Sequence, residues 1–227
     1  MKFNLIHAKG LDTVSFAVNR VFCAGYAGRN QEKVREHIAE LAKIGVPAPE
    51  RTPTVYPVSK RLFTNERTIF SQSADTSGEV EFVLLLKDNK IFVSVGSDQT
   101  DRELEKQVID KSKQVCEKPV AADAWDYEEV QDHWDSLILR SWITDEKGKR
   151  IYQEGHVTAL LPVPELVDVI KRETAISLDG AVIYSGTVPA KNGFEFAKIW
   201  DLELEDPVLN RKINHHYEVV ALDEEMK

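Results

Sequence analysis

The sequence predicts a mostly β domain with a few short helices. Segments with alternating apolar residues recur along the chain, they outnumber segments with helical spacing, and turn residues separate them. The chain has 227 residues, of which 42% are hydrophobic and 30% are charged. A chain of this length and composition can bury a substantial core, and a single β-rich domain often reaches this size.

The first 50 residues are predicted to form a small α/β portion. Residues 1–23 are typical of two strands around a turn at Lys9, because apolar and polar residues alternate there. A helix is predicted over residues 31–44, since its apolar residues recur at helical spacing and Gly45 follows it. This helix is a candidate lid over the rest of the chain.

Residues 51–227 are predicted to form the β-rich core. Four prolines between residues 47 and 57 favour an irregular connector, which places a boundary near residue 50. Beyond it, the pattern predicts a hairpin of strands 79–86 and 90–95, a helix over 101–109, a second hairpin of 137–143 with 150–154, a helix over 164–172 and a strand over 181–184.

The formal net charge of -9 and the sequence pI of about 5.3 disfavour a nucleic-acid partner, because phosphate backbones repel an acidic surface. The two cysteines lie far apart and have no metal-ligand spacing. The chain has neither an apolar signal segment nor the roughly 18 consecutive apolar residues that can span a bilayer. We therefore expect a cytoplasmic protein without a membrane partner.

Three carboxylates are candidates for one functional site. Glu79 and Glu81 are two apart at the start of a predicted strand, so both side chains point to one face. Asp98 directly follows the next strand, and a hairpin would return it to the same end. Buried carboxylates are costly unless something neutralises them, and hard cations such as Mg²⁺ prefer oxygen ligands. The alternatives are a solvated strand start for Glu79 and Glu81, and Asp101 in place of Asp98.

Four short motifs follow one another along the chain: SGEVEFVLLL, GSDQTDR, Lys111-Ser112 and Gly186-Thr187. In this order they resemble the fumarylacetoacetate hydrolase superfamily, and most closely an uncharacterised bacterial branch of it. The resemblance covers residues 79–190 and implies a mixed β-roll or β-sandwich like the C-terminal domain of these enzymes. The sequence departs from the family pattern at Ser97, where Asn is usual, and at Asp110, where Gly is usual.

The resemblance also implies roles for individual residues. Glu79, Glu81 and Asp98 would be ligands of Mg²⁺, with Mn²⁺ or Ca²⁺ as alternatives. A small oxo-acid substrate would then lie beside the ion.

Other side chains would act on the substrate itself. Arg102, Lys111 and Thr187 would bind its carboxylate and oxo oxygens, and Lys111 would also polarise the reacting carbonyl. His37 and Glu40, three residues apart on the predicted lid helix, would form the pair that activates water. His37 could equally be a packing residue at the edge of the apolar stripe of that helix.

The function implied is a divalent-metal-dependent hydrolase or lyase that cleaves a carbon–carbon bond of a small oxo-carboxylic acid through an enolate. Decarboxylation, isomerisation or hydration of a similar substrate would use the same enolate. A non-catalytic binding or scaffold protein that retains the fold is the alternative outside enzymes. We expect a homodimer, since such folds often pair through apolar strand faces.

Overall fold

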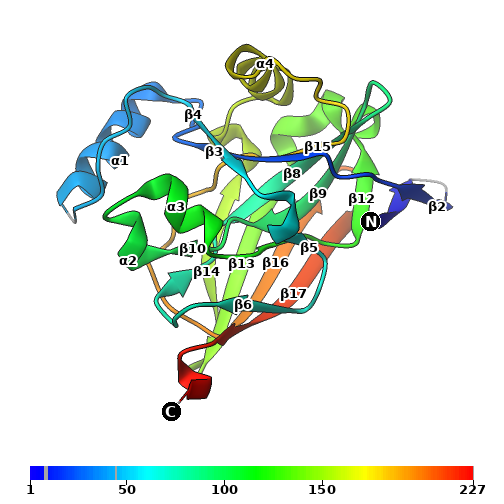
Figure 1. The fold of residues 1–227 in the computed structure, drawn as a ribbon. Coiled ribbons are helices and arrows are strands. Elements are labelled where there is room, and N and C mark those ends of the chain that lie inside the picture. The colour runs from blue at the N-terminus through cyan, green and yellow to red at the C-terminus, as the bar shows by residue number, and fades with distance from the viewer. Residues whose placement is uncertain (8–9, 44, 227) are drawn as a thin grey trace.

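The computed structural model describes residues 1–7, 10–43 and 45–226, apart from the side chain of His37. Two large sheets pack against each other (Figure 1). The strands in contact are β8 (Val80–Lys87) and β9 (Lys90–Ser97) of the first sheet with β13 (Ile138–Asp145), β16 (Ile199–Asp206) and β17 (Arg211–Ala221) of the second. The predicted mostly β fold with a few helices is confirmed.

The first sheet contains the predicted hairpin of β8 and β9 at its centre. In the described ranges it has eight strands, in the order β2 (Gly10–Ser15), β1 (Lys2–His7), β12 (Asp123–Asp126), β9 (Lys90–Ser97), β8 (Val80–Lys87), β15 (Ala181–Tyr184), β3 (Arg20–Gly25) and β4 (Thr54–Val58). The apolar run of β8 is explained by its position, because both of its faces are covered.

The second sheet contains the other predicted hairpin, β13 with β14. Its strand order is β14 (Gly148–His156), β13 (Ile138–Asp145), β16 (Ile199–Asp206), β17 (Arg211–Ala221) and β6 (Thr68–Ser71). Two short pairs complete the strands of the described chain: β7 (Thr76–Ser77) with β10 (Thr100–Asp101), and β5 (Phe63–Thr64) with β11 (Lys118–Pro119). The core between the large sheets includes Phe82, which meets the Trp134 ring edge-on at 5.0 Å between centroids.

Four α-helices are present in the described residues: α1 (Gln31–Lys43), α2 (Arg102–Glu105), α3 (Ile109–Gln114) and α4 (Val163–Glu173). The predicted helices over 31–44 and 164–172 correspond to α1 and α4, although Ile44 lies outside the described residues. Figure 1 shows α1 and α4 on the same side of the molecule, with β3 and β4 between them. None of the helices in these ranges is long and apolar enough to cross a membrane.

Two local predictions are wrong. The proline-rich connector contains a strand, β4, at the edge of the sheet. An edge strand tolerates Pro57 because it has a partner strand on one side only, so the missing backbone N–H of proline can face the open side. The single helix predicted over 101–109 is interrupted, since Val108 has an extended backbone with φ of −149°. The β-branched Val108 and Ile109 favour such a break.

The predicted N-terminal portion and the predicted core share one sheet. β1 pairs in parallel with β12, and β3 pairs in parallel with β15. The predicted boundary near residue 50 therefore lies between two neighbouring strands, β3 and β4, of a continuous sheet.

Candidate metal centre

The β8–β9 hairpin brings three carboxylates to one end of the first sheet. Val80 pairs with Ser97, so Glu79 and Asp98 flank the same end of the ladder. The backbone N–H of Asp98 donates to the carbonyl oxygen of Glu79 at 3.0 Å, which extends the pairing by one step. One carboxylate oxygen from each of Glu79, Glu81 and Asp98 lies within 4.8 Å of the other two.

Ser97 stabilises this end of the β8–β9 hairpin through its hydroxyl group. Its hydroxyl oxygen accepts the N–H of Glu79 at 3.0 Å, and the Tyr217 hydroxyl of β17 lies 3.0 Å from it. The residue that departs from the family pattern in the sequence therefore links the two sheets next to the carboxylates.

Glu81 is the most deeply enclosed of the three carboxylates. Its side chain accepts the N–H of Gly186 at 2.9 Å, and the residue is 1% exposed. Gly186 has φ of +85°, a left-handed conformation that favours glycine, and an added Cβ would lie 3.0 Å from the carbonyl oxygen of Ala24. Burial raises the pKa of Glu81 well above its usual value, and the charges of Asp98 and Glu79 raise it further.

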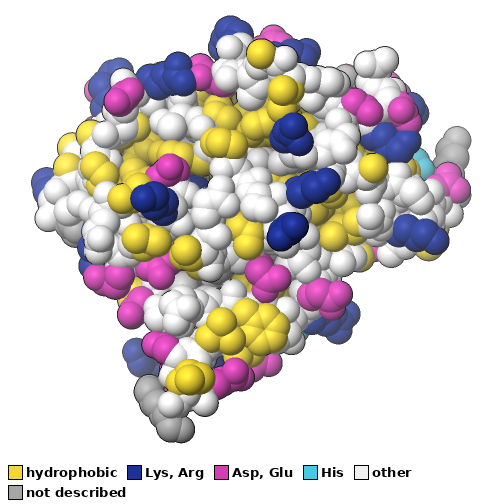
Figure 2. All heavy atoms as spheres, in the orientation of Figure 1, with side chains coloured by type: hydrophobic (Ala, Val, Ile, Leu, Met, Phe, Trp, Pro, Cys, Tyr) yellow, Lys and Arg dark blue, Asp and Glu magenta, His cyan; other side chains and the backbone are white. Residues whose placement is uncertain are grey.

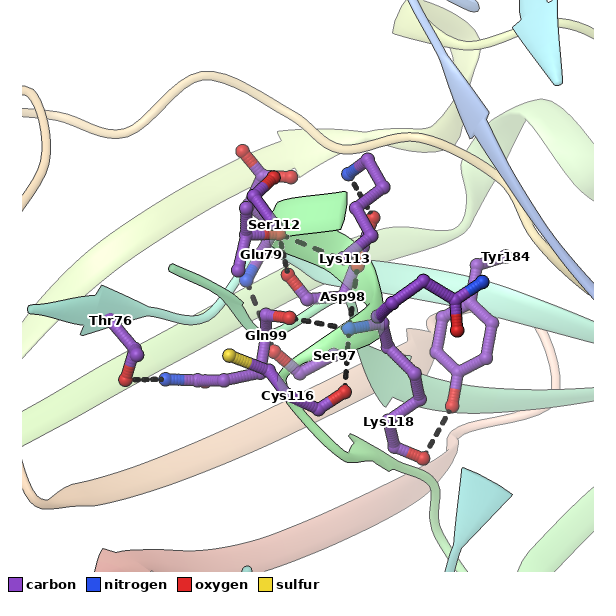
Figure 3. Close-up of polar contacts among 12 residues, drawn as sticks. Thr76, Glu79, Ser97, Asp98, Gln99, Ser112, Lys113, Cys116, Lys118 and Tyr184 are labelled. Atoms are coloured by element: carbon purple, nitrogen blue, oxygen red, sulfur yellow. Dashed lines mark hydrogen bonds and ion pairs between the residues drawn. The ribbon is translucent and has the colours of Figure 1, made fainter. Parts of the chain in front are cut away.

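Asp98 contacts two buried lysines. Figure 3 shows Lys113, from α3, and Lys118, from β11, converging on its carboxylate. The Lys113 ammonium contacts one oxygen of Asp98, and that of Lys118 lies 3.4 Å from the other. Burial alone would raise the pKa of Asp98, but Lys113 and Lys118 outweigh it, so the net pKa lies below the usual value.

Arg102, which the sequence predicts to bind the substrate, contacts protein groups in this structure. Its Nη2 lies 3.0 Å from Glu79, its Nη1 lies 2.8 Å from Glu105, and its Nε donates to the hydroxyl of Ser77 at 2.6 Å. The guanidinium also stacks 4.1 Å above the Phe194 ring and is 3% exposed. All three nitrogens bond to the protein, so Arg102 orients Glu79 in this structure.

Lys111 is also differently placed from its prediction. It lies on the exposed side of α3, and Lys113, two residues later, lines the cavity and contacts Asp98. Residues two apart on a helix do not share a face, so only one of these lysines can point inward. Sequence reasoning missed Lys113 and Lys118; two further lysines close behind Lys111 were the available signal.

A cavity of about 910 Å³ opens in front of Glu79 and Glu81. Thr187, predicted to bind the substrate, lines this cavity, and its hydroxyl donates to the carbonyl oxygen of Val80 at 2.7 Å and accepts from Gln153 at 2.8 Å. The remaining wall is largely apolar and aromatic, and Figure 2 shows hydrophobic side chains gathered between α1 and α4 on this face of the molecule.

α1 forms one wall of the same cavity. Val34, Leu41 and Glu40 of this helix line it. The side chain of His37 lies outside the described part of the structure, so the predicted pairing of His37 with Glu40 stays a prediction. The lid role of α1 likewise stays a prediction from the sequence.

The donor set fits a hard divalent cation. Three carboxylates supply oxygen ligands, which Mg²⁺, Mn²⁺ and Ca²⁺ prefer. Glu81 has one backbone N–H as its partner and a carboxylate that burial pushes toward protonation, so a cation would relieve its desolvation.

The fold is shared by solved structures that include the following three. A candidate fumarylacetoacetate isomerase/hydrolase from Oleispira antarctica superposes with a TM-score of 0.68 at 16% identity, over 92% of this chain and 96% of that one. A candidate fumarylacetoacetate hydrolase family protein from Yersinia pestis CO92 gives 0.66 at 18% identity, over 96% and 100%. A 2-keto-3-deoxy-D-arabinonate dehydratase complexed with magnesium and 2,5-dioxopentanoate gives 0.59 at 18% identity, over 89% and 73%.

Comparison of the sequence, rather than the structure, identifies the family. No curated protein matches the chain. The family model DUF2848, described as "Protein of unknown function", matches residues 24–217, a range that contains the three carboxylates, both buried lysines and α1. The chain therefore belongs to the DUF2848 family and has the fold of the fumarylacetoacetate hydrolase family.

Proposed function

We propose that this protein is a divalent-metal-dependent hydrolase or lyase that cleaves a carbon–carbon bond in a small oxo-carboxylic acid. The observation that carries the proposal is the meeting of Glu79, Glu81 and Asp98 within 4.8 Å, with Glu79 and Glu81 lining a cavity. Support also comes from the dehydratase of the same fold that is complexed with magnesium and 2,5-dioxopentanoate.

Glu79, Glu81 and Asp98 would hold the ion. A bound Mg²⁺ or Mn²⁺ would act as a Lewis acid on the substrate carbonyl and lower the free energy of an enolate. Arg102 keeps the Glu79 carboxylate oriented through the 3.0 Å ion pair. The N–H of Gly186 does the same for Glu81.

Lys113 is the proposed electrophilic group of the chain, in the role that the sequence assigned to Lys111. It is 5% exposed and lines the cavity next to Asp98, so its ammonium can donate to a substrate oxygen in a low-dielectric site. Thr187 lines the same cavity, and its backbone N–H is the proposed donor to the substrate carboxylate, because its hydroxyl proton is already donated to the carbonyl oxygen of Val80.

Proton transfer is proposed for the His37 and Glu40 pair on α1. Glu40 lines the same cavity as Glu79 and Glu81. A histidine oriented by a carboxylate takes a proton from water near neutral pH. Replacing Glu40 by Gln would then lower kcat while leaving the binding of Mn²⁺ unchanged.

The test is product analysis by NMR of purified protein with Mg²⁺ or Mn²⁺ and a panel of oxaloacetate-like and dioxo acids. We expect turnover that needs the metal and is lost in Glu79→Ala. Cleavage products identify a hydrolase or lyase, whereas loss of CO₂ or water identifies a decarboxylase or dehydratase, which the fold neighbour makes the second candidate. Metal binding without turnover across the panel would favour a binding or scaffold protein.

The homodimer and the cytoplasmic location remain predictions from the sequence. Sedimentation of the purified protein gives the oligomeric state directly.

A further inference from the structure

Three basic side chains already contact the carboxylates of the candidate metal centre. The Arg102 guanidinium pairs with Glu79, and the ammonium groups of Lys113 and Lys118 both contact Asp98. These basic residues are between 0% and 5% exposed, so their charges lie inside the protein with those of the carboxylates. The site therefore carries its own counterions.

The charges at the site nearly balance. The cluster consists of four carboxylates, including the Glu105 that pairs with Arg102, and three cations: Glu79, Glu81, Asp98 and Glu105 against Arg102, Lys113 and Lys118. With every group ionised, one negative charge is left, and a divalent ion would change it to one positive charge. An uncompensated charge is costly inside a protein, and one anionic group of a ligand would compensate it.

Lys113 is the cation that has room to move. Arg102 bonds through all three nitrogens, and Lys118 also donates to the carbonyl oxygens of Gln99 at 2.6 Å and Cys116 at 2.9 Å. For Lys113, the structure gives one hydrogen-bond acceptor among the described residues, Asp98, and an aromatic neighbour, the Tyr56 ring, 5.6 Å away. Unlike Arg102 and Lys118, it lines the cavity.

We propose that Lys113 is an exchangeable internal counterion, which leaves Asp98 when the metal binds and then pairs with the carboxylate of the oxo-acid. Metal and oxo-acid therefore bind cooperatively, and each is bound weakly without the other. The four-carbon stem of lysine allows this exchange without movement of the helix. The inference rests on the proposed function, since it needs both the metal and the anion at this site.

The experiment measures the binding of Mn²⁺ by electron paramagnetic resonance of the free ion, with and without saturating oxalate, corrected for the Mn²⁺–oxalate complex in solution. For wild type, we expect oxalate to lower the Kd of Mn²⁺ about tenfold or more, within the usual range of coupling between two ligands. Lys113→Met removes the internal counterion, so it should bind Mn²⁺ more tightly than wild type when oxalate is absent, and oxalate should then change the Kd by less than about threefold.

The matched control is Lys111→Met, on the same helix but exposed, which should behave as wild type. Lys113→Gln keeps a donor for Asp98 and replaces the Met variant if circular dichroism shows that the latter does not fold. An unchanged Kd of Mn²⁺ with oxalate overturns the inference while leaving the metal site in place. The same holds if neither Lys113 variant differs from wild type. Absence of Mn²⁺ binding by wild type and by the folded Lys113 variants, with or without oxalate, overturns the proposed function as well.

Discussion

Two strands of the protein carry the same Glu-x-Glu spacing but differ in what neutralises the carboxylates. Glu79 and Glu81 lie at the start of β8, and Glu203 and Glu205 lie on β16 of the other sheet. In both cases the period of the strand turns the two side chains to one face. Spacing alone therefore does not distinguish them.

The Glu203 and Glu205 pair is neutralised by long basic side chains near the surface. Arg140 contacts both carboxylates, and Lys212 lies 3.1 Å from Glu203 and 3.6 Å from Glu205. The hydrogen bond from Arg140 holds the pKa of Glu205 below its usual value. Glu81, by contrast, is held by one backbone N–H, and its pKa is raised. The opposite pKa directions of Glu81 and Glu205 therefore reflect burial at the first residue and a basic partner at the second.

Substitution of Asp98 should reduce the free energy of unfolding more than any other change considered for these two pairs. Asp98→Asn leaves the buried Lys113 and Lys118 without a carboxylate, and breaking a buried ion pair typically costs about 3–5 kcal/mol. Urea unfolding without metal measures this loss in the free energy of unfolding. Glu205→Gln is the control from the other pair, with an expected loss under about 1 kcal/mol because its partners are partly solvated. Equal losses of unfolding free energy in the two variants would show that the cluster around Asp98 is no more enclosed than the one around Glu205.

The next prediction separates the two pairs by their response to metal. Saturating Mn²⁺, at about a hundredfold excess over its Kd, should stabilise wild type by about 2.7 kcal/mol. Glu81→Gln should abolish that stabilisation, since Gln offers a neutral and weaker ligand, whereas Glu205→Gln should retain it. Thermal melting curves with and without Mn²⁺ measure both. Loss of the stabilisation by Mn²⁺ in Glu205→Gln would instead assign the metal site to Glu203 and Glu205.

Much of the fold follows from local sequence patterns. The strand over 181–184 and the helix over 31–44 were predictable because apolar periodicity and turn residues both mark them. β4 was not, because its prolines argue against a strand unless the strand is known to lie at an edge. The edge position depends on the pairing with β3, which no local pattern encodes.

The site was predictable in part for a similar reason. The predicted hairpin and the family resemblance both place Glu79, Glu81 and Asp98 together, because the three carboxylates lie at neighbouring strand ends. The choice between Lys111 and Lys113 depends on how α3 is rotated about its axis after the break at Val108. Likewise, the pairing of Arg102 with Glu105 and Glu79 depends on the length of α2, which the sequence overestimates.

The second sheet, which carries Glu203 and Glu205, also contains a buried group whose titration should make stability depend on pH. Burial, followed by the charges of Arg67 and His216, lowers the pKa of His215 to about 4. Below its ordinary pKa of about 6.5, the unfolded chain binds a proton that the folded chain does not, so stability falls as pH falls. Between pH 6.5 and pH 5 we expect a loss of about 1.5 kcal/mol from this residue.

Denaturant unfolding across this pH range tests the assignment. His215→Gln should flatten the dependence of the unfolding free energy on pH. His216→Gln, at the exposed neighbour that pairs with Asp201 at 2.8 Å, should leave the slope in place. A slope that persists in the His215 variant and disappears in the His216 variant would assign the titration to the surface residue.

The weakest interaction among these predictions is the ion pair between Arg140 and Glu205 in the second sheet. A double-mutant cycle of Arg140→Gln and Glu205→Gln should give an interaction of about 0.2–1 kcal/mol, because both side chains keep about a fifth of their surface exposed. Raising the salt to about 1 M, where the Debye length is about 3 Å, should reduce it further. A coupling above about 2 kcal/mol that does not change with salt concentration would mean that Glu203 and Glu205 are as enclosed as Glu81. The two Glu-x-Glu strands would then be equally enclosed, and burial would no longer explain why the cation is proposed at only one of them.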